Sequence, residues 1–404
     1  MVYVIISTFY SCGGAEIQAL NEFRYINKLQ DNRAVLLTFD PSLKTDESKE
    51  KNHINLYGSY TNQERRLYDN FFSNKIAKLL KKILDEVKPD VIHMHNISFA
   101  YLTICRAIKG YHVIQTVHDY SVVCHTGCYI HPDGEVCNYS DWKHCRKMCF
   151  NDSFQSRVKF AYRNIVDGRI IKARKDSIDL LIAPSHKLTD VLIKFGYKNV
   201  VCINNAIDQS AFRGFKKNVY AEEKRIVLLI GRIGWRKGVY QLLNAYRSGD
   251  YNSIQLHIMG EIDPEEEAKI ISLIKTSGSV YHGKMEHASV IDFLQKTFAV
   301  IIPSYGVENY PNVGLEGTLA QCVICGSDRG GIKEQVVDNS LTFKVTDPND
   351  IKRCLRKLDE MSEEEYNDIC KKQMDKFNVL NTQEVYFRKL QDVLSGTSIT
   401  KKKE

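Results

Sequence analysis

Short apolar runs alternate with longer stretches of helical periodicity along most of the chain. Runs rich in β-branched residues predict six strands in the first half, at 2–7, 33–39, 90–95, 112–118, 180–184 and 200–204. The same pattern predicts six strands in the second half, at 225–230, 255–259, 280–281, 299–303, 322–326 and 341–345. This alternation indicates an α/β fold with parallel sheets that are covered by helices.

One helix is strongly predicted between Ser73 and Val87. Its apolar residues recur at three- and four-residue spacing and form a single stripe, and four lysines lie off that stripe. Pro89 ends the helix. The lysines form a basic flank that either faces water or contacts an anionic membrane surface.

A polar stretch at 209–224, with Gly214 and a run of charges, predicts a linker between two domains. We expect an N-terminal domain at 1–208 and a C-terminal domain at 225–375. A helix and tail follow at 376–404, and packing of this helix against the N-terminal domain is one option. Doubly wound sheets bind ligands at the carboxyl ends of their strands, so we expect the active site between the two domains.

The composition agrees with a soluble globular chain of two domains. The 404 residues are 43% hydrophobic and 26% charged, which excludes a disordered, collagen-like or coiled-coil protein. The first apolar segment lacks a basic start and a cleavage site, so we expect a strand, no signal peptide and a cytoplasmic protein. The net charge of +7 excludes no anionic partner, but the clustered arginines and aromatics of a nucleic-acid domain are absent from the sequence.

The segment 303–317 carries the most informative chemistry. It leaves a predicted strand, turns through Gly306 and Pro311, and enters a helix near Asn312. A helix start offers backbone N–H groups and a positive dipole end, which suit a phosphate. Glu308 lies on the turn and Glu316 lies in the helix, where their carboxylates can accept hydrogen bonds from sugar or ribose hydroxyls.

Two further turns offer contacts to an anion. Arg232 and Lys237 lie on a glycine-rich turn after the predicted strand 225–230, and two cations there can hold a diphosphate. Near the N-terminus, Gly13 and Gly14 form a strand-to-helix turn at which the backbone can approach a ligand closely.

Taken together, these segments resemble the family 4 retaining glycosyltransferases of the GT-B fold over about residues 1–340. The specific part of the resemblance is the pair Glu308 and Glu316 with the upstream Arg232 and Lys237. The other matching segments are 13–16, 90–96, 116–120, 183–185, 203–208 and 330–334. The resemblance implies two Rossmann-like, doubly wound parallel-sheet domains that face a central cleft.

The resemblance also implies residue roles on the donor side. Arg232 and Lys237 would contact the donor diphosphate, Glu308 the donor sugar, and Glu316 the ribose hydroxyls. A helix start would meet the phosphates through its backbone, and a loop would meet the nucleobase. The helix-start residues are Asn312, Val313 and Leu315, and the loop residues are Gly283, Lys284 and Met285.

On the N-terminal side, the resemblance places His118 beside the reacting sugar and Gly14 near the diphosphate. The catalytic group would then be His118, Arg232, Lys237 and Glu308. No Asp-x-Asp follows a strand, so we expect no metal cofactor; the helix dipole and the two cations would neutralise the leaving group. Front-face attack with retention, in which the departing phosphate accepts the proton of the acceptor, comes from the resemblance.

The sequence departs from the family pattern at two turns. Gln321 stands where the family usually has a glycine, and Asn205 with Ala206 stands in place of Asn-Gly. These departures affect the local turns and leave the charged residues unchanged.

Five cysteines fall within residues 124–149, which we interpret as an insertion in the N-terminal domain that overhangs the acceptor side. They are Cys124, Cys128, Cys137, Cys145 and Cys149. With nearby histidines they could supply four zinc ligands, but they contain no Cys-x-x-Cys pair, so reduced cysteines are expected and a structural zinc is the alternative. His93 and His95 alternate on a buried strand and are interpreted as satisfied polar residues near the cleft.

The expected function is transfer of a hexose or N-acetylhexosamine from a UDP- or GDP-sugar to a glycan or lipid-linked acceptor. The resemblance suggests lipopolysaccharide, capsule or exopolysaccharide biosynthesis, with weak peripheral contact to the inner face of the membrane and no nucleic-acid partner. Two alternatives stay open. The first is a nucleotide-sugar hydrolase or epimerase on the same fold, and the second is a nucleic-acid-binding protein with a Cys/His zinc module.

Overall fold

The computed structural model of the protein describes residues 1–11, 13–43, 49–56, 73–97, 100–138, 142, 144–150, 152–215, 217 and 219–396. The chain divides into two units. The first consists of Met1–Gly127, Asn138–Asn204 and Tyr386–Glu404, and the second of Cys128–Cys137 and Asn205–Val385. Each unit is described by itself below.

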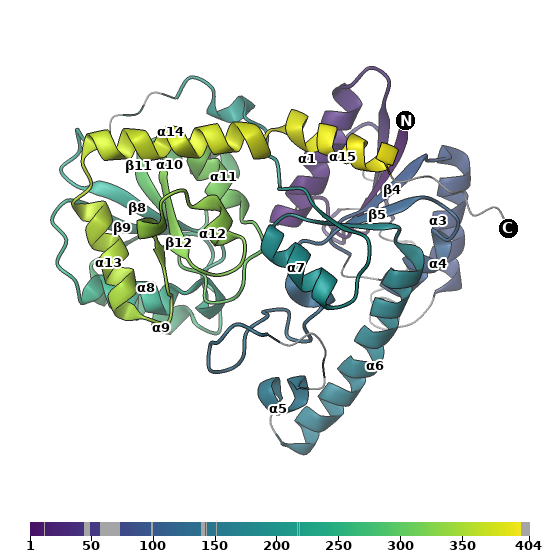
Figure 1. Ribbon diagram of the computed structural model, residues 1–404, viewed down its shortest axis with the longest axis horizontal. Helices are drawn as coiled ribbons and strands as arrows, with labels where there is room; N and C mark the ends of the chain where they lie inside the picture. Colours follow the sequence, from purple (N-terminus) through teal and green to yellow (C-terminus); the bar gives the residue numbers. More distant parts are fainter. Residues whose placement is uncertain are drawn as a thin grey trace. The chain divides into compact units, whose positions relative to one another are not determined.

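The first unit is built on a seven-stranded sheet in which every pair of neighbouring strands is parallel (Figure 1). The strand order is β3-β2-β1-β4-β5-β6-β7. The strands are β1 (Val2–Ser7), β2 (Arg33–Thr38), β3 (His53–Asn55), β4 (Val91–Met94), β5 (Val113–Thr116), β6 (Leu180–Ala183) and β7 (Val200–Cys202). The central strands β1 and β4 consist almost entirely of buried side chains, as expected for a sheet that is covered on both faces.

The six strands predicted for this half are present, but β3 was missed. It is three residues long, and His53 and Asn55 are polar, so the sequence shows no apolar run there. Both side chains are nevertheless buried, because Thr38 Oγ1 on β2 lies 2.8 Å from His53 Nε2 and 3.1 Å from Asn55 Oδ1. This edge strand is therefore held by side-chain hydrogen bonds that periodicity cannot reveal.

The structure describes six α-helices in the first unit before its C-terminal segment. They are α1 (Gly14–Lys28), α3 (Asn74–Val87), α4 (Tyr101–Ala107), α5 (Cys145–Cys149), α6 (Phe154–Ser177) and α7 (His186–Lys194). The predicted helix is confirmed as α3: the Ser73 hydroxyl accepts a hydrogen bond from the Ile76 N–H at its start. Its apolar stripe packs into the core, with Leu80 and Leu84 fully buried.

The second unit contains a six-stranded parallel sheet in the order β10-β9-β8-β11-β12-β13. The strands are β8 (Arg225–Ile230), β9 (Ile254–Met259), β10 (Val280–Tyr281), β11 (Thr297–Ile302), β12 (Val323–Ser327) and β13 (Thr342–Phe343). All six were predicted within a few residues of these bounds. The predicted fold class, two doubly wound parallel α/β sheets, is confirmed.

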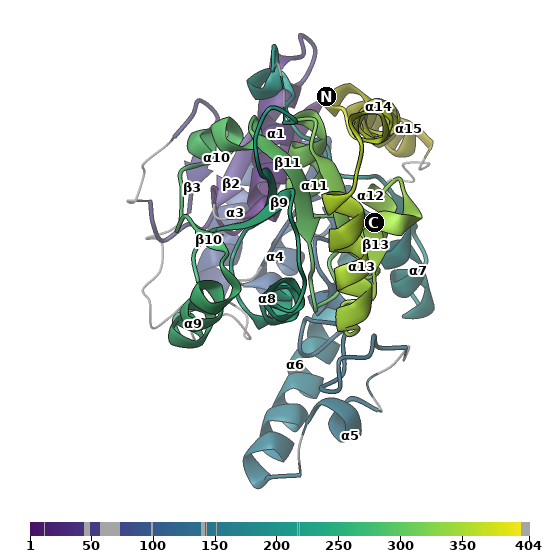
Figure 2. The same ribbon diagram turned by 90° about the vertical axis from the view of Figure 1, so that its left-hand side faces the viewer.

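Seven helices of the second unit surround this sheet (Figure 2). They are α8 (Val239–Arg247), α9 (Glu267–Ser277), α10 (His287–Leu294), α11 (Asn312–Leu319), α12 (Ile332–Gln335), α13 (Pro348–Asp359) and α14 (Glu363–Leu380). The stretch 209–224, predicted as a linker, lies within this unit. Phe212 is buried there, and Lys217 Nζ donates to the Ala320 carbonyl at 2.6 Å.

The chain returns to the first unit through its C-terminal helix α15 (Gln383–Gly396), which belongs to that unit from Tyr386 onward. The Phe387 ring lies 6.2 Å from the Tyr3 ring and 5.7 Å from the Tyr25 ring, and Leu390 is fully buried. The helix thus adds apolar side chains to the core of the first unit. Within the described ranges, every helix is too short or too polar to cross a bilayer.

Candidate active site

The turn after β8 is shaped by a glycine that no other residue can replace. Gly238 has φ +70°, and a Cβ atom there would lie 1.8 Å from the Pro303 carbonyl oxygen. The backbone N–H of Tyr305 also donates to the Arg236 carbonyl, at 2.8 Å. The turn that carries Arg232 and Lys237 is therefore pressed against the carboxyl end of β11.

This close approach brings Lys237 and Glu308 together. Lys237 Nζ lies 2.6 Å from Glu308 Oε1, and the Ser304 hydroxyl lies 3.1 Å from the same oxygen. The two side chains are 36% and 24% exposed, so both remain accessible to a ligand. Two residues singled out from the sequence thus form an ion pair at the carboxyl ends of neighbouring strands.

The loop that carries Glu308 is braced from behind by a second glycine turn. Gly330 has φ +60°, and a Cβ atom there would lie 1.9 Å from the Glu308 carbonyl oxygen. The N–H of Gly331 donates to the same carbonyl at 3.0 Å. Arg329, whose side chain stacks on the Tyr305 ring, also donates to the Tyr305 carbonyl. These contacts fix the backbone from which the Glu308 carboxylate projects.

Arg232 lies on the same turn but has a different partner. Its Nε donates to an Asp263 carboxylate oxygen, and this hydrogen bond raises the pKa of the guanidinium. The arginine side chain is 75% exposed. Asp263 could not be singled out from the sequence, because it follows β9 and comes close to Arg232 only in the folded sheet.

Glu316 is hydrogen-bonded to His287, a second residue that could not be singled out from the sequence. Glu316 lies in the second turn of α11, and its Oε1 is 2.9 Å from His287 Nε2 at the start of α10. The hydrogen bond to Glu316 raises the pKa of His287 above its usual value. Glu308 and Glu316 therefore have separate partners, Lys237 and His287, although they are close in sequence.

The first turn of α11 carries no charged side chain, so it can contact an anion through its backbone N–H groups. Pro311 precedes it and provides no side-chain cap. Asn205 Nδ2 donates to the Tyr310 carbonyl at 3.0 Å and to Asn312 Oδ1 at 3.2 Å. Asn205, at one of the two positions that depart from the family pattern, thus supports the loop before the predicted phosphate site.

The loop predicted to meet a nucleobase follows β10. Gly283 has φ +69°, and its carbonyl accepts from the Gly260 N–H at 2.8 Å, which ties the loop to the end of β9. Lys284 Nζ pairs with Glu261 Oε2 at 3.0 Å, and Met285 is exposed. The loop lies at the carboxyl edge of the sheet, and its role stays a prediction.

In the first unit, Gly14 is the first residue of α1. The buried Glu16 carboxylate accepts from Asn96 Nδ2 at 2.8 Å, which links the helix start to the segment after β4. His118 lies just beyond β5. Gly14 and His118 thus follow the carboxyl ends of β1 and β5 in the sheet.

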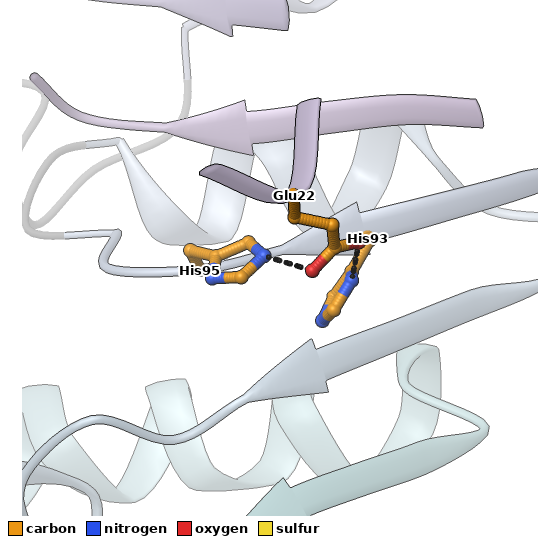
Figure 3. A group of neighbouring side chains, drawn as sticks. All are labelled: Glu22, His93 and His95. Carbon is orange, nitrogen blue, oxygen red and sulfur yellow. Dashed lines mark hydrogen bonds and ion pairs between the residues drawn. The ribbon is translucent and has the colours of Figure 1, made fainter. Parts of the chain in front are cut away.

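A buried carboxylate, Glu22 on α1, lies beside His93 and His95 (Figure 3). Its oxygens lie 2.6 Å from His93 Nδ1, 3.3 Å from His95 Nε2 and 2.9 Å from the Tyr386 hydroxyl. Burial alone would raise the pKa of Glu22, but the two histidines outweigh it and lower the pKa well below the usual value. Glu22 is therefore a carboxylate that accepts three contacts inside the core.

This cluster extends to His118 through His95. His95 Nδ1 lies 3.0 Å from His118 Nε2. Burial lowers the pKa of His95 to about 4 and that of His118 well below 6.5, so both rings are neutral at pH 7. Because a carboxylate only accepts, we assign the His95 proton to Nε2, facing Glu22. His118 then donates from Nε2 and keeps Nδ1 as an acceptor.

The predicted satisfaction by neighbouring groups is confirmed for His93, whose ring nitrogens bond Glu22 and the Thr116 hydroxyl, whereas the buried His95 Nε2 has only the 3.3 Å contact to Glu22 and no hydrogen bond. With Glu22 the two histidines form the one group, among the described residues, whose ligand atoms are close enough to hold a metal ion. The cysteines at 124–149 form no such group within the described ranges. Cys128 and Cys137 belong to the second unit, and Cys124, Cys145 and Cys149 to the first.

One expectation about the insertion needs correction. Part of it, Cys128–Cys137, belongs to the second unit, whereas the sequence placed all of it in the N-terminal domain. Val307 N–H donates to the Cys128 carbonyl at 3.2 Å, and Arg329 Nη2 donates to the Gly134 carbonyl at 2.5 Å. These are contacts to the loop that carries Glu308, and sequence position alone could not reveal them.

Comparison with known proteins accounts for both halves of the chain. The family model described as Glycosyltransferase Family 4 matches residues 12–211, and the model described as Glycosyl transferases group 1 matches residues 212–377. The segments that carry Gly14 and His118 lie in the first match, and those with Lys237, Glu308 and Glu316 lie in the second.

Two curated relatives match parts of the chain. An uncharacterized 42.6 kDa protein in the cps region of Klebsiella pneumoniae is 24% identical over 271 residues, which are 65% of this chain and 64% of that protein. Lipopolysaccharide 1,2-N-acetylglucosaminetransferase of Salmonella typhimurium is 28% identical over 155 residues, which are 33% of this chain and 40% of the relative. The chain thus spans less than two thirds of the length of either relative.

A solved structure extends the likeness to the whole chain. The structure of Anabaena Alr3699/HepE in complex with UDP-glucose aligns over 98% of this chain and all of that one, with a TM-score of 0.69 and 15% identity. At this identity the likeness shows the fold. Together with the two family models, it shows that the chain belongs to the group 1, family 4 glycosyltransferases of the GT-B fold.

Proposed function

We propose that the protein transfers a sugar from a nucleoside diphosphate sugar to a glycan or lipid-linked acceptor. The observation that carries the proposal is the ion pair between Lys237 and Glu308, with 2.6 Å between Nζ and Oε1, at the carboxyl edge of the second sheet. An ammonium group and a carboxylate side by side fit a ligand that joins a phosphate to a hydroxylated ring. The UDP-glucose in the Anabaena structure supports a donor of this class.

In this proposal each charged group contacts one part of the donor. Lys237 and Arg232 contact the diphosphate, and the α11 start adds its backbone N–H groups and dipole. Glu308 accepts from hydroxyls of the sugar, and Glu316 accepts from the ribose. Lys237 exchanges part of its contact with Glu308 for the phosphate when the donor binds.

The reaction then needs charge stabilisation more than a covalent catalyst. The acceptor oxygen forms the new bond to the anomeric carbon while the bond from that carbon to the diphosphate oxygen breaks. The proton of the acceptor hydroxyl passes to the departing diphosphate, so the atoms and charges balance. Lys237 and Arg232 stabilise the negative charge that develops on the diphosphate, and removal of one such group typically costs ~10²–10³ in rate. Retention of configuration is part of this proposal.

The acceptor and its setting are inferred from relatives. The Salmonella relative is a lipopolysaccharide N-acetylglucosaminetransferase, and the Klebsiella relative is encoded in a cps region. We therefore place the protein in surface polysaccharide biosynthesis, with a cytoplasmic location at the inner face of the membrane. Fractionation of cells into soluble, inner-membrane and outer-membrane pools tests that location.

A donor panel tests the proposed function directly. Thermal shifts with UDP, GDP and ADP identify the base, because a ligand at ~100 times its dissociation constant stabilises the fold by ~2.7 kcal/mol. The matching sugar donors are then incubated with a lipid-linked glycan, and products are separated into free sugar, epimer and extended glycan. Lys237→Ala should abolish transfer, whereas Lys275→Ala, an exposed lysine on α9, should not. If free sugar forms at the same rate without an acceptor, the protein is a hydrolase.

A further inference from the structure

The longest helix of the first unit, α6, has two halves with different surroundings. Its second half packs into the core through Ile170 and Ala173. In its first half, four large apolar side chains are exposed to solvent: Phe154 is 80%, Val158 53%, Tyr162 47% and Ile165 62% exposed. These four account for more than a third of the eleven exposed large apolar side chains among the described residues.

The four side chains share one face of the helix. They are separated by four, four and three residues, a spacing that places them in one stripe at 3.6 residues per turn. We call Phe154, Val158, Tyr162 and Ile165 the α6 stripe. A contiguous exposed stripe of this kind marks a surface that binds something apolar.

The contacts from α6 to His125 in the insertion come from the opposite face of the helix. Arg163 Nη2 donates to the His125 carbonyl at 2.9 Å, and Asp167 Oδ2 lies 2.6 Å from His125 Nδ1. The Phe160 ring packs edge-on against His125 and Phe150. These residues hold the insertion, and none of them belongs to the stripe.

Basic side chains flank the stripe. Residues 145–177 contain nine lysines and arginines against three aspartates, a net charge of +6, where the whole chain has +7. Arg157 and Lys159 lie on either side of the stripe and are exposed, and neither forms an ion pair in the described part of the chain. Both views show α5, which carries Arg146 and Lys147, beside the first half of α6 and away from the sheet (Figures 1 and 2).

A surface hollow lies where α5 and α6 meet. Its lining combines the two chemistries of the flank and the stripe: Arg146, Arg157, Phe160, Ala161, Asn164 and Ile165. Two guanidinium groups beside apolar side chains fit a phosphate that is attached to a hydrocarbon chain.

We propose that the α6 stripe and its basic flanks bind an anionic lipid bilayer, with the apolar side chains inserted at the headgroup level. An exposed apolar stripe between basic residues is the pattern of an interfacial helix. A second copy of the chain fits less well, because a symmetric pair would bring the basic flanks of the two stripes face to face. The proposal depends on the proposed function in one respect: binding to the bilayer gives the protein access to a lipid-linked acceptor.

The lysine-rich helix α3, considered from the sequence, is a weaker candidate. Its apolar side chains are buried, so it has nothing to insert. Lys81 and Lys82 pair with Asp85 and Glu86 one turn on, at 3.1 and 3.9 Å. Its surface is therefore closer to neutral, and it serves as a control in the test.

The test uses flotation of the full chain with vesicles of phosphatidylglycerol and phosphatidylcholine, or of phosphatidylcholine alone, at low and high salt. We expect binding to the anionic vesicles at low salt and weaker binding at high salt. Phe154→Ser with Ile165→Ser should lower the affinity about tenfold or more, whereas Ile193→Ser with Val379→Ser, equally exposed apolar residues elsewhere, should leave it unchanged. Arg157→Gln with Lys159→Gln should remove the salt dependence, and Lys81→Gln with Lys82→Gln should not.

Several outcomes would overturn the proposal. One is absence of binding to anionic vesicles at low salt, and another is equal loss in the Ile193 and Val379 control. If light scattering shows a dimer that the stripe variant disrupts while vesicle binding persists, a second copy covers the stripe. Binding of UDP in solution is measured on the same variants. A protein that floats but binds no nucleotide would contradict the proposed function and leave the lipid surface standing.

Discussion

Lys237 and Glu308 form an ion pair, with 2.6 Å between Nζ and Oε1. The cation proposed for the diphosphate is therefore neutralised in part by the carboxylate proposed for the sugar. Such a pair prepositions both groups, but it also means that the donor competes with Glu308 for Lys237. The ion pair therefore predicts that a substitution of Glu308 lowers sugar transfer without lowering nucleotide binding.

Glu308→Gln should keep or raise the affinity for the free nucleoside diphosphate, because Lys237 loses its carboxylate partner. Transfer should fall by ~10²–10³, since the proposed contact to the sugar is weakened. Calorimetric titration with the nucleoside diphosphate and initial rates with the full donor measure the two effects. A parallel loss of both would show that Glu308 serves only to hold Lys237 in place.

Glu316→Gln provides the contrasting variant. Glu316 is bound to His287 on α10 and is proposed to accept from the ribose, so its loss should weaken the free nucleoside diphosphate itself by about tenfold. The comparison uses the same calorimetric titration. If Glu308→Gln and Glu316→Gln lower nucleotide affinity equally, the division between sugar and ribose contacts is wrong.

The charged residues of the second unit were predictable because each follows a strand directly along the chain. Lys237 and Glu308 follow β8 and β11, and parallel strands bring their carboxyl ends to one edge. Their partners could not be predicted in the same way. Asp263, His287 and Arg329 come from other turns and meet the site only through tertiary packing.

The limits of local sequence signals are clearer still in the cysteine-rich insertion. Its position after His118 suggested the acceptor side, yet Cys128–Cys137 packs against the loop that carries Glu308. A short loop without apolar periodicity is positioned by individual hydrogen bonds, such as Arg329 to Gly134. Nothing in its own sequence specifies that partner.

Because of the buried histidines, we expect the folded protein to lose stability in acid. The pKa of His95 is about 4 in the folded protein and near 6.5 when unfolded, so the unfolded chain binds more protons between these values. The contribution of neutral His95 is fully present above pH 6.5 and is lost as the pH falls toward 4, on the order of 3 kcal/mol for this group. The lowered pKa values of His118 and Glu22 act in the same direction.

Urea unfolding at a series of pH values measures this effect. His95→Gln should flatten the decline between pH 6.5 and pH 4, because an amide takes up no proton there. An equally steep decline in the His95 variant would remove this histidine as a source of the acid sensitivity.

We expect one hydroxyl group, that of Tyr386, to stabilise the packing of the C-terminal helix α15 in the first unit. Tyr386 donates to the buried Glu22 carboxylate at 2.9 Å, and hydrogen bonds to buried charged groups contribute about 1.5–3 kcal/mol. Tyr386→Phe should therefore lower the free energy of unfolding of the first unit by about that amount. Tyr240→Phe is the matched control, because Tyr240 makes the same kind of bond to Glu266 at the surface, where the loss should stay below ~1 kcal/mol. Equal losses would mean that burial of Glu22 adds nothing to this bond.

The turn before β12 gives the last prediction, at a position where the family usually has glycine. Gln321 has φ +54°, a left-handed conformation that costs a residue with a side chain roughly 1–2 kcal/mol. Its side chain is exposed, and the Tyr366 hydroxyl and the Cys370 thiol donate to its backbone carbonyl, which a substitution of the side chain leaves in place. Gln321→Gly should therefore raise the free energy of unfolding of the second unit by ~0.5–1 kcal/mol, after the greater freedom of glycine in the unfolded chain is subtracted. Gln321→Ala keeps the strained backbone and should show no gain in urea unfolding. A gain in the alanine variant equal to that of glycine would show that the glutamine side chain, and not the left-handed backbone, limits stability at this turn.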